Sequence, residues 1–171
     1  MRSNDDFDIP FEGLKLGKHS FEFEITDKFF ANITFSSIER GKVKLTFKLE
    51  KKETMMVGDF DFDGFVVKSC DRCTDALDVP VKLKAQLIFK YGEEQSTDEN
   101  LVVIEPSEYK LRLAPICYEL IEVNLPQRNI HPEGKCNKEM LSLIEKYSKV
   151  LNDNKDTDCL DPRWEALKKI K

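Results

Sequence analysis

Two stretches of strict alternation between apolar and polar residues constrain the fold of this chain most. Residues 43–49 and 81–87 place a valine, leucine, phenylalanine or alanine at every second position, and mostly lysines stand between them. Side chains of a strand point alternately to its two faces, so this period is typical of a strand with one face on a core and the other in water. The pattern predicts a half-buried antiparallel sheet with a cationic outer face.

Further segments in the first two thirds of the chain also read as strands. Residues 19–25 alternate in the same way, residues 57–68 continue with strand-like composition, and residues 101–104 form a short apolar run. Gly58 and Gly64 interrupt the second of these segments, where glycine often marks a bulge or a bend. We therefore expect this part of the chain to consist mainly of strands.

Helices are expected towards the C-terminus. Pro115 suits the first helical position of a segment that runs to Glu122, and Leu125-Pro126 then stops the helix. Asn137 can cap a second helix that has one apolar face and ends near Leu151.

The order of these elements predicts the fold class and the domain division. Strands followed by helices, without a parallel β-α-β pattern, indicate an α+β protein with an antiparallel, strongly bent β-sheet or partial barrel and C-terminal helices. We expect a single domain over residues 1–151. Residues 152–171 are then a polar linker and a short C-terminal amphipathic helix with Trp164 on its apolar face.

Cysteine and histidine residues in two distant parts of the chain form a candidate metal site. Cys70 and Cys73 stand three positions apart after a strand, and two thiols at that spacing can bind one ion. His131 and Cys136 supply two more soft ligands from a loop that contains proline and glycine. Zinc prefers four such ligands in a tetrahedral array, so these residues predict a structural zinc site joining the middle of the chain to its last third.

The thiols also have two other interpretations. Cys70 and Cys73 can be ordinary thiols, because a single Cys-x-x-Cys is a weak signal and the spacing of His131 and Cys136 is unusual. They can also form a redox pair, although thioredoxin-like activity needs the first cysteine at a helix N-terminus, and here the pair follows a strand. Cys117 lies in a helical pattern and is interpreted as a small buried apolar residue.

One acidic motif invites an interpretation as a calcium site. The segment Asp59-x-Asp61-x-Asp63-Gly64 matches the first half of an EF-hand loop, but the position that should hold a bidentate glutamate is Cys70. Phenylalanines alternate with the acids as they do on a strand, so we expect an exposed acidic strand face instead.

The bulk composition excludes several classes of protein. No apolar run approaches the ~20 residues that cross a membrane, and the acidic start of the chain fits neither a signal nor a transit peptide. We therefore expect a cytoplasmic protein with no membrane partner. No nucleotide-binding loop, nucleophile elbow or His-Glu-x-x-His motif is present, so we expect neither an enzyme nor a small-molecule substrate.

The outer face of the sheet is a candidate contact surface for RNA. Lysines from both alternating strands lie on it if the strands share a sheet, and such a face can follow a phosphate backbone. The residues proposed for RNA or partner contact are Arg72, at the cysteine turn, and Lys42, Lys44, Lys48, Lys82 and Lys84. The alternative is an ordinary solvated face, because edge lysines prevent aggregation and acids on neighbouring strands can neutralise them.

These residues together resemble the YceD family, the large ribosomal RNA subunit accumulation proteins. The likeness begins with a strand ending in Cys70-x-Arg72-Cys73, followed by Leu77 and Pro80 at the start of a long strand. Residues 113–126 then read Leu-x-Pro-Ile-x-x-Glu-Leu-Ile-x-Val-x-Leu-Pro, and residues 161–169 read Asp-Pro-Arg-Trp-x-x-Leu-Lys-Lys. This ending, with His131 and Cys136, is similar to the Bacteroidetes-type branch of the family.

The resemblance implies a non-enzymatic cytoplasmic factor that supports accumulation of large-subunit ribosomal RNA, through contacts with precursor rRNA or a ribosomal protein. Where this chain has His131 and Cys136, many relatives carry a second Cys-x-x-Cys-like cluster. A second interpretation is an acidic module that binds a basic ribosomal protein without touching RNA, because a net charge of −5 suits a basic partner. A third is a thiol-redox protein that uses Cys70 and Cys73.

Overall fold

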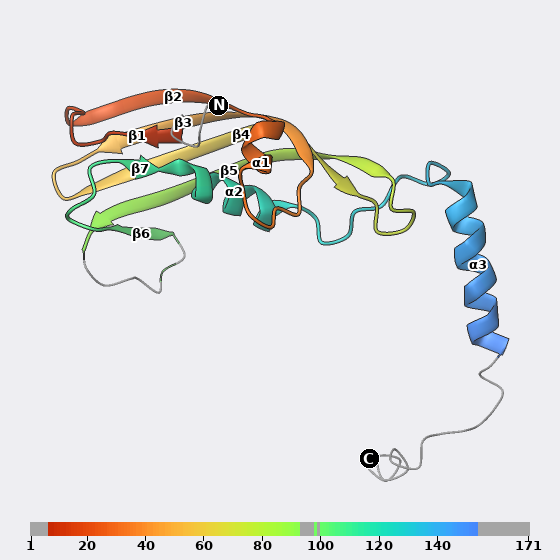
Figure 1. Ribbon diagram of the computed structural model, residues 1–171. Coiled ribbons are helices and arrows are strands. Elements are labelled where there is room, and N and C mark those ends of the chain that lie inside the picture. Colours follow the sequence, from red (N-terminus) through yellow and green to blue (C-terminus); the bar gives the residue numbers. More distant parts are fainter. Residues whose placement is uncertain (1–6, 93–97, 99, 154–171) are drawn as a thin grey trace, which may run out of the picture.

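The computed structural model describes residues 7–92, 98 and 100–153 (Figure 1). Its elements, in chain order, are β1 (Asp8–Ile9), β2 (Gly17–Ile25), α1 (Asp27–Ala31), β3 (Arg40–Lys51), β4 (Met55–Ser69), β5 (Ala76–Tyr91), β6 (Leu101–Ile104), β7 (Leu111–Arg112), α2 (Leu113–Asn124) and α3 (Lys138–Asp153).

An open five-stranded sheet in the order β2-β3-β4-β5-β6 dominates the fold. Neighbouring strands from β2 to β5 are antiparallel, as the alternation predicted, whereas β6 pairs parallel to the end of β5. The short strands β1 and β7 form a separate antiparallel pair. With helices at the C-terminal side, the α+β prediction is confirmed.

The core lies on the inner face of this sheet. Val43, Leu45, Phe47 and Leu49 of β3 are fully buried, and the lysines between them are exposed. Helix α2 lies against the same face and contributes Leu113, Ala114, Cys117 and Ile121 to the core (Figure 1). Cys117 is therefore the small buried residue that its helical position indicated, and burial raises the pKa of its thiol.

The two glycines of β4 do not form bulges. Pairing of β4 with β3 and with β5 continues without interruption through Gly58 and Gly64. A Cβ atom at Gly64 would lie 2.2 Å from the carbonyl oxygen of Lys42, and one at Gly58 would lie 2.7 Å from the Phe47 ring. Glycine is required at these positions by close packing, so the expectation of a bulge was wrong.

The helices begin and end close to the predicted residues. Helix α2 begins at Leu113, so Pro115 lies within the first turn and not at the first position. The Asn137 side chain caps α3, because its Oδ1 accepts a hydrogen bond from the backbone N–H of Glu139 at 3.0 Å. Helix α3 points away from the sheet (Figure 1).

The predicted domain division is only partly covered by the structure. Helix α3 continues to Asp153, past the expected boundary at residue 151, which stays a prediction. The short C-terminal helix with Trp164 lies outside the described residues. No helix in the described part of the chain is both long and apolar enough to cross a membrane.

Candidate metal centre

The first pair of candidate ligands lies in the tight turn between β4 and β5. The backbone N–H of Cys70 donates to Asp75 O, and that of Thr74 donates to Cys70 O, each at 2.8 Å. Thr74 adopts a φ of 63°, in the left-handed region that β-branched residues rarely occupy. These bonds close residues 70–75 into a compact turn in which both thiols are buried.

A second loop is fastened to this turn by a pair of hydrogen bonds. The backbone N–H of Asp71 donates to Asn129 O at 2.8 Å. In return, Asp71 Oδ2 accepts from the backbone N–H of Asn129 at 2.6 Å. We call these two hydrogen bonds the Asp71–Asn129 bracket. Because Asn129 lies two positions before His131, the bracket places the second pair of candidate ligands next to the first.

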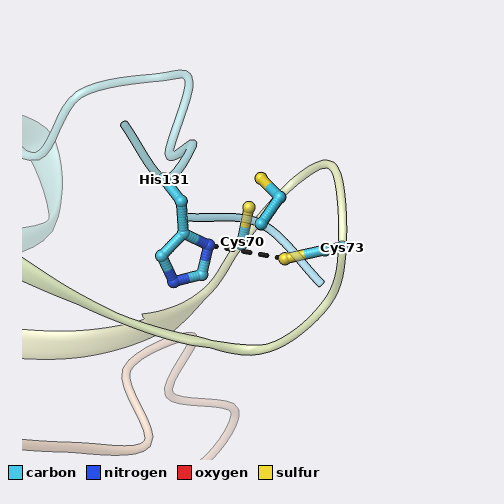
Figure 2. A group of neighbouring side chains, drawn as sticks. Cys70, Cys73 and His131 are labelled. Atoms are coloured by element: carbon cyan, nitrogen blue, oxygen red, sulfur yellow. Dashed lines mark hydrogen bonds between the residues drawn. The ribbon is translucent and has the colours of Figure 1, made fainter. Parts of the chain in front are cut away.

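All four predicted ligands meet at one place. One ligand atom from each of Cys70, Cys73, His131 and Cys136 can be chosen so that all lie within 4.8 Å of one another. Cys73 Sγ lies 3.4 Å from His131 Nδ1, and Figure 2 shows the ring directed at that sulfur. A tetrahedral zinc ion with normal bond lengths would hold a sulfur and a nitrogen about 3.5 Å apart. This pair already has the spacing of two zinc ligands, and the most distant pairs of the cluster would have to approach by about 1 Å to bind one ion.

A hydrogen bond selects the nitrogen of His131 that faces the cluster. Nε2 lies 3.1 Å from the backbone oxygen of Ala76, the first residue of β5. A ring N–H at Nε2 satisfies that oxygen and leaves Nδ1 as the ligand atom towards the thiols. Histidine ligands usually have their other nitrogen held in this way. Sequence reasoning found the residue but not this orientation, because the partner is a main-chain oxygen 55 positions away.

The cluster favours a thiolate. Burial opposes ionisation of Cys70, but hydrogen bonds from the backbone N–H groups of Cys73, Arg72 and His131 outweigh it and lower the pKa of this thiol to about 6. Hydrogen bonding to Cys70 raises the pKa of His131, whereas burial raises the pKa of the Cys136 thiol. A metal ion would replace the protons shared within this group, as thiolate and imidazole ligands require.

A small apolar shell encloses the thiols. Leu77 packs against them from the start of β5, Ile130 from the second loop, and Met140 and Leu141 from the first turn of α3. The buried residues of the main sheet core form a separate cluster, and Leu77 packs against both clusters. The four-ligand cluster is therefore the point that attaches the loop of residues 126–136 and helix α3 to the end of the sheet.

The lysines proposed for RNA contact share the outer face, but acids separate them. Lys42, Lys44 and Lys48 lie on β3, Lys82 and Lys84 on β5, and Asp59, Asp61 and Asp63 run along β4 between them. Ion pairs join Lys42 to Glu24, Lys44 to Glu22 and Lys84 to Asp61, at 3.0 to 3.2 Å. Arg72 is exposed at the cysteine turn, at the end of the sheet. The acids on β4 form the exposed strand face expected from the EF-hand-like motif.

Comparison with protein-family models gives a match over residues 58–171, about two thirds of the chain, to the large ribosomal RNA subunit accumulation protein YceD. The chain belongs to the YceD family. The match confirms the resemblance drawn from the motifs, and its range contains all four residues of the cluster together with Arg72. No curated protein and no solved structure matches the chain. YceD membership implies a part in the accumulation of large ribosomal subunit RNA.

The bracket between the two loops of this YceD protein leads to a first prediction. Asp71→Ala removes the acceptor of the Asn129 N–H, and Asn129 is only 6% exposed. We expect a loss of about 1 to 2 kcal/mol of stability in the metal-loaded protein. Thermal denaturation measures the change, and Asp71→Asn, which keeps an acceptor oxygen, is the matched control. Equal melting temperatures for both variants and the wild type would rule out this role of the bracket.

Proposed function

We propose that this chain is a non-enzymatic cytoplasmic factor that supports accumulation of large-subunit ribosomal RNA, and that a structural zinc ion organises its contact surface. The single observation that carries the proposal is the meeting of Cys70, Cys73, His131 and Cys136, from two distant loops, within 4.8 Å. Family membership supplies the process. The cluster supplies the part of the molecule through which that process is carried out.

The donor set favours zinc in a structural role. Three thiols and one imidazole are the soft ligands that zinc binds in closed tetrahedral sites, and four protein ligands leave no open position for substrate or water. The three cysteines are buried, and apolar side chains of β5, the second loop and α3 pack against them. Such a site stabilises structure and holds neighbouring groups in place.

We infer that the contact surface for precursor rRNA or a ribosomal protein includes the cysteine turn, with Arg72 at its exposed position. A guanidinium there suits phosphates, base edges and carboxylates alike. The lysines of β3 and β5 extend the proposed surface. Their ion pairs with Glu22, Glu24 and Asp61 reduce the net positive charge of the sheet face. We therefore expect Arg72 to contribute more to binding than any of these lysines.

The test is affinity purification of the tagged chain from cells, with and without RNase. We expect precursors of the large-subunit rRNA to co-purify through links that RNase breaks. Arg72→Ala should lower this yield about fivefold or more, because a guanidinium contact typically contributes on the order of 1–3 kcal/mol. Lys146→Ala, an exposed cation on α3, is the control and should leave the yield unchanged. Unchanged recovery with Arg72→Ala would remove Arg72 from the contact surface.

A second candidate is an acidic module that binds a basic ribosomal protein without RNA. The observation that favours it is the neutralised sheet face, combined with a net charge of −5. In the same purification this function predicts one ribosomal protein that stays bound after RNase treatment. Recovery of no ribosomal component under either condition would contradict both candidates.

A further inference from the structure

Strand β5 has a long edge without a partner strand in the described part of the chain. On one side it pairs with β4 from Ala76 to Lys90, but on the other side it pairs with β6 only from Ile88 to Tyr91. Within the described residues, no strand lies beside residues 76–87 on that second side. An open edge of this length is a template for another strand, and proteins usually protect it.

The hydrogen-bond pattern identifies the main-chain groups that face the open edge. Ile88 donates its N–H to Asn100 O at 2.8 Å, so Ile88 faces β6. The β4–β5 ladder has no break, so every second residue from Ile88 backwards faces the same side. Ala76 follows this rule, because its oxygen is the one that His131 contacts.

Among the residues that the structure describes, both ends of the open edge have partners and its middle has none. The backbone oxygen of Ala76 contacts His131 of the candidate metal centre, and the backbone N–H of Ile88 donates to Asn100 O, just before β6. Pro80 has no N–H to offer. The N–H and C=O groups of Asp78, Lys82, Lys84 and Gln86 and the C=O of Pro80 remain, and no hydrogen bond of these groups on the open side is found in the described part of the chain.

A groove runs beside this segment, and its lining combines apolar residues with polar ones that include Glu119 and Asn124. It has a volume of about 1030 Å³ and lies between the inner face of β5 and helix α2. Its apolar lining includes Leu83, Ala85, Val102, Ile116, Leu120 and Val123. Val123 is 76% exposed, and Leu83 and Ala85 are only half-buried although they lie on the inner face of the sheet. A strand added at the edge would place every second side chain in this groove.

Charges on the outer face indicate what the other side chains of such a strand should be. The sign alternates from strand to strand: Glu22 and Glu24 on β2, lysines on β3, aspartates on β4, then Lys82 and Lys84 on β5. Opposite charges on neighbouring strands stabilise a sheet, and like charges destabilise it. A strand added beside β5 would therefore be stabilised by acidic residues on its outer face, next to Lys82 and Lys84. A second copy of this chain would instead bring lysines against lysines.

We propose that the β5 edge from Lys82 to Gln86, together with the groove, binds an extended segment of a partner protein in which acidic and apolar residues alternate. The segment adds a strand to the sheet, with its apolar side chains against α2 and its acids beside Lys82 and Lys84. This interaction goes beyond the proposed function and requires neither the metal centre nor RNA contact.

A labelled synthetic peptide tests the proposal on the full chain. The probe is the fluorescent octapeptide Glu-Val-Glu-Val-Glu-Val-Glu-Val, with binding followed by fluorescence anisotropy. We expect saturable binding to the wild type and none for the matched peptide in which lysine replaces glutamate. Lys84→Glu should weaken binding, whereas Lys44→Glu, on the same face but on β3, should not. Absence of saturable binding, or equal binding of the two peptides, would overturn the proposal.

A proline variant separates main-chain docking from simple charge attraction. Gln86→Pro removes one N–H from the open edge without breaking the ladder to β4, and Pro80 shows that this edge accepts proline. We expect it to weaken peptide binding about tenfold, while Gln86→Ala binds as the wild type does. Thermal denaturation confirms that both variants fold. Equal effects of the two variants would contradict strand addition.

Two measurements test whether the β5 edge is covered by something other than a partner segment. Hydrogen exchange of the free chain detects coverage by the chain itself, and sedimentation detects a second copy. The N–H groups of Lys82, Lys84 and Gln86 should exchange rapidly in the free protein and become protected when the peptide binds. Protection without peptide would mean that the chain covers its own edge, which contradicts the proposal. A dimer that Gln86→Pro dissociates would likewise overturn it in favour of a second copy.

Discussion

Removal of zinc is expected to release the second loop and helix α3 while the sheet stays folded. The three buried thiols form a cluster separate from the buried residues of the sheet core, with Leu77 packed against both. Ile130, Met140 and Leu141 pack against the thiols alone, so we expect the cluster to hold residues 126–141 in place. Structural zinc contributes on the order of 10 kcal/mol in small zinc-binding peptides, far more than so few apolar contacts supply. The main sheet buries its own phenylalanine-rich core, so we expect it to stay folded without an ion.

Hydrogen exchange with and without a strong chelator measures this effect. Amides of residues 70–75 and 126–141 should lose their protection, whereas amides of β3 and β4 should keep theirs. Cys70→Ser should give the same pattern without chelator. Cys117→Ala, a thiol buried in the sheet core, should keep the metal and the protection of both loops. If the chelator leaves exchange in both loops unchanged, the metal does not hold them together.

Gly64→Ala is expected to cost about 3 kcal/mol or more of the free energy of unfolding. The added Cβ would meet the carbonyl oxygen of Lys42 at 2.2 Å and the Cα of Val43 at 2.7 Å. Both atoms belong to the backbone of β3, so no side-chain rotation relieves the clash. The strands must separate where Gly64 pairs with Val43, and this cost exceeds the entropy that alanine removes from the unfolded chain.

Urea denaturation of Gly64→Ala and Gly13→Ala provides the measurement with its control. A Cβ at Gly13 meets nothing within 4 Å, and its φ lies outside the left-handed region, so this variant should unfold near the wild-type midpoint. Gly58→Ala should lie between the two, because its contacts are the edges of the Phe47 and Phe89 rings, which can shift. A Gly64→Ala midpoint equal to that of Gly13→Ala would contradict the close approach of β3 and β4.

The sequence was sufficient to predict the long strands and not the short elements. Alternation over residues 43–49 determines which side chains face the core, and all four apolar positions there are fully buried. Elements as short as α1, β1 and β7 hold too few residues to show a period. The run at residues 101–104 showed a strand but not its parallel direction, because direction depends on the path of the preceding loop.

The candidate site was predictable in its ligands but not in its supports. Thiol and imidazole residues are rare enough for their spacing to be visible in the sequence, and the structure brings all four together. The Asp71–Asn129 bracket and the Ala76 oxygen behind His131 depend on how two loops meet in space. The ion pairs on the outer face depend on strand register in the same way. Lys44 pairs diagonally with Glu22 although Glu24 lies directly opposite it.

X-ray absorption at the zinc edge, on protein purified without chelator, tests the zinc centre most directly. We expect one zinc ion per chain, with three sulfur atoms at about 2.3 Å and one nitrogen atom at about 2.0 Å. Cys136→Ser should reduce the sulfur count or release the ion. A preparation that contains no zinc, or zinc surrounded mainly by oxygen, would contradict a metal centre built from these two loops.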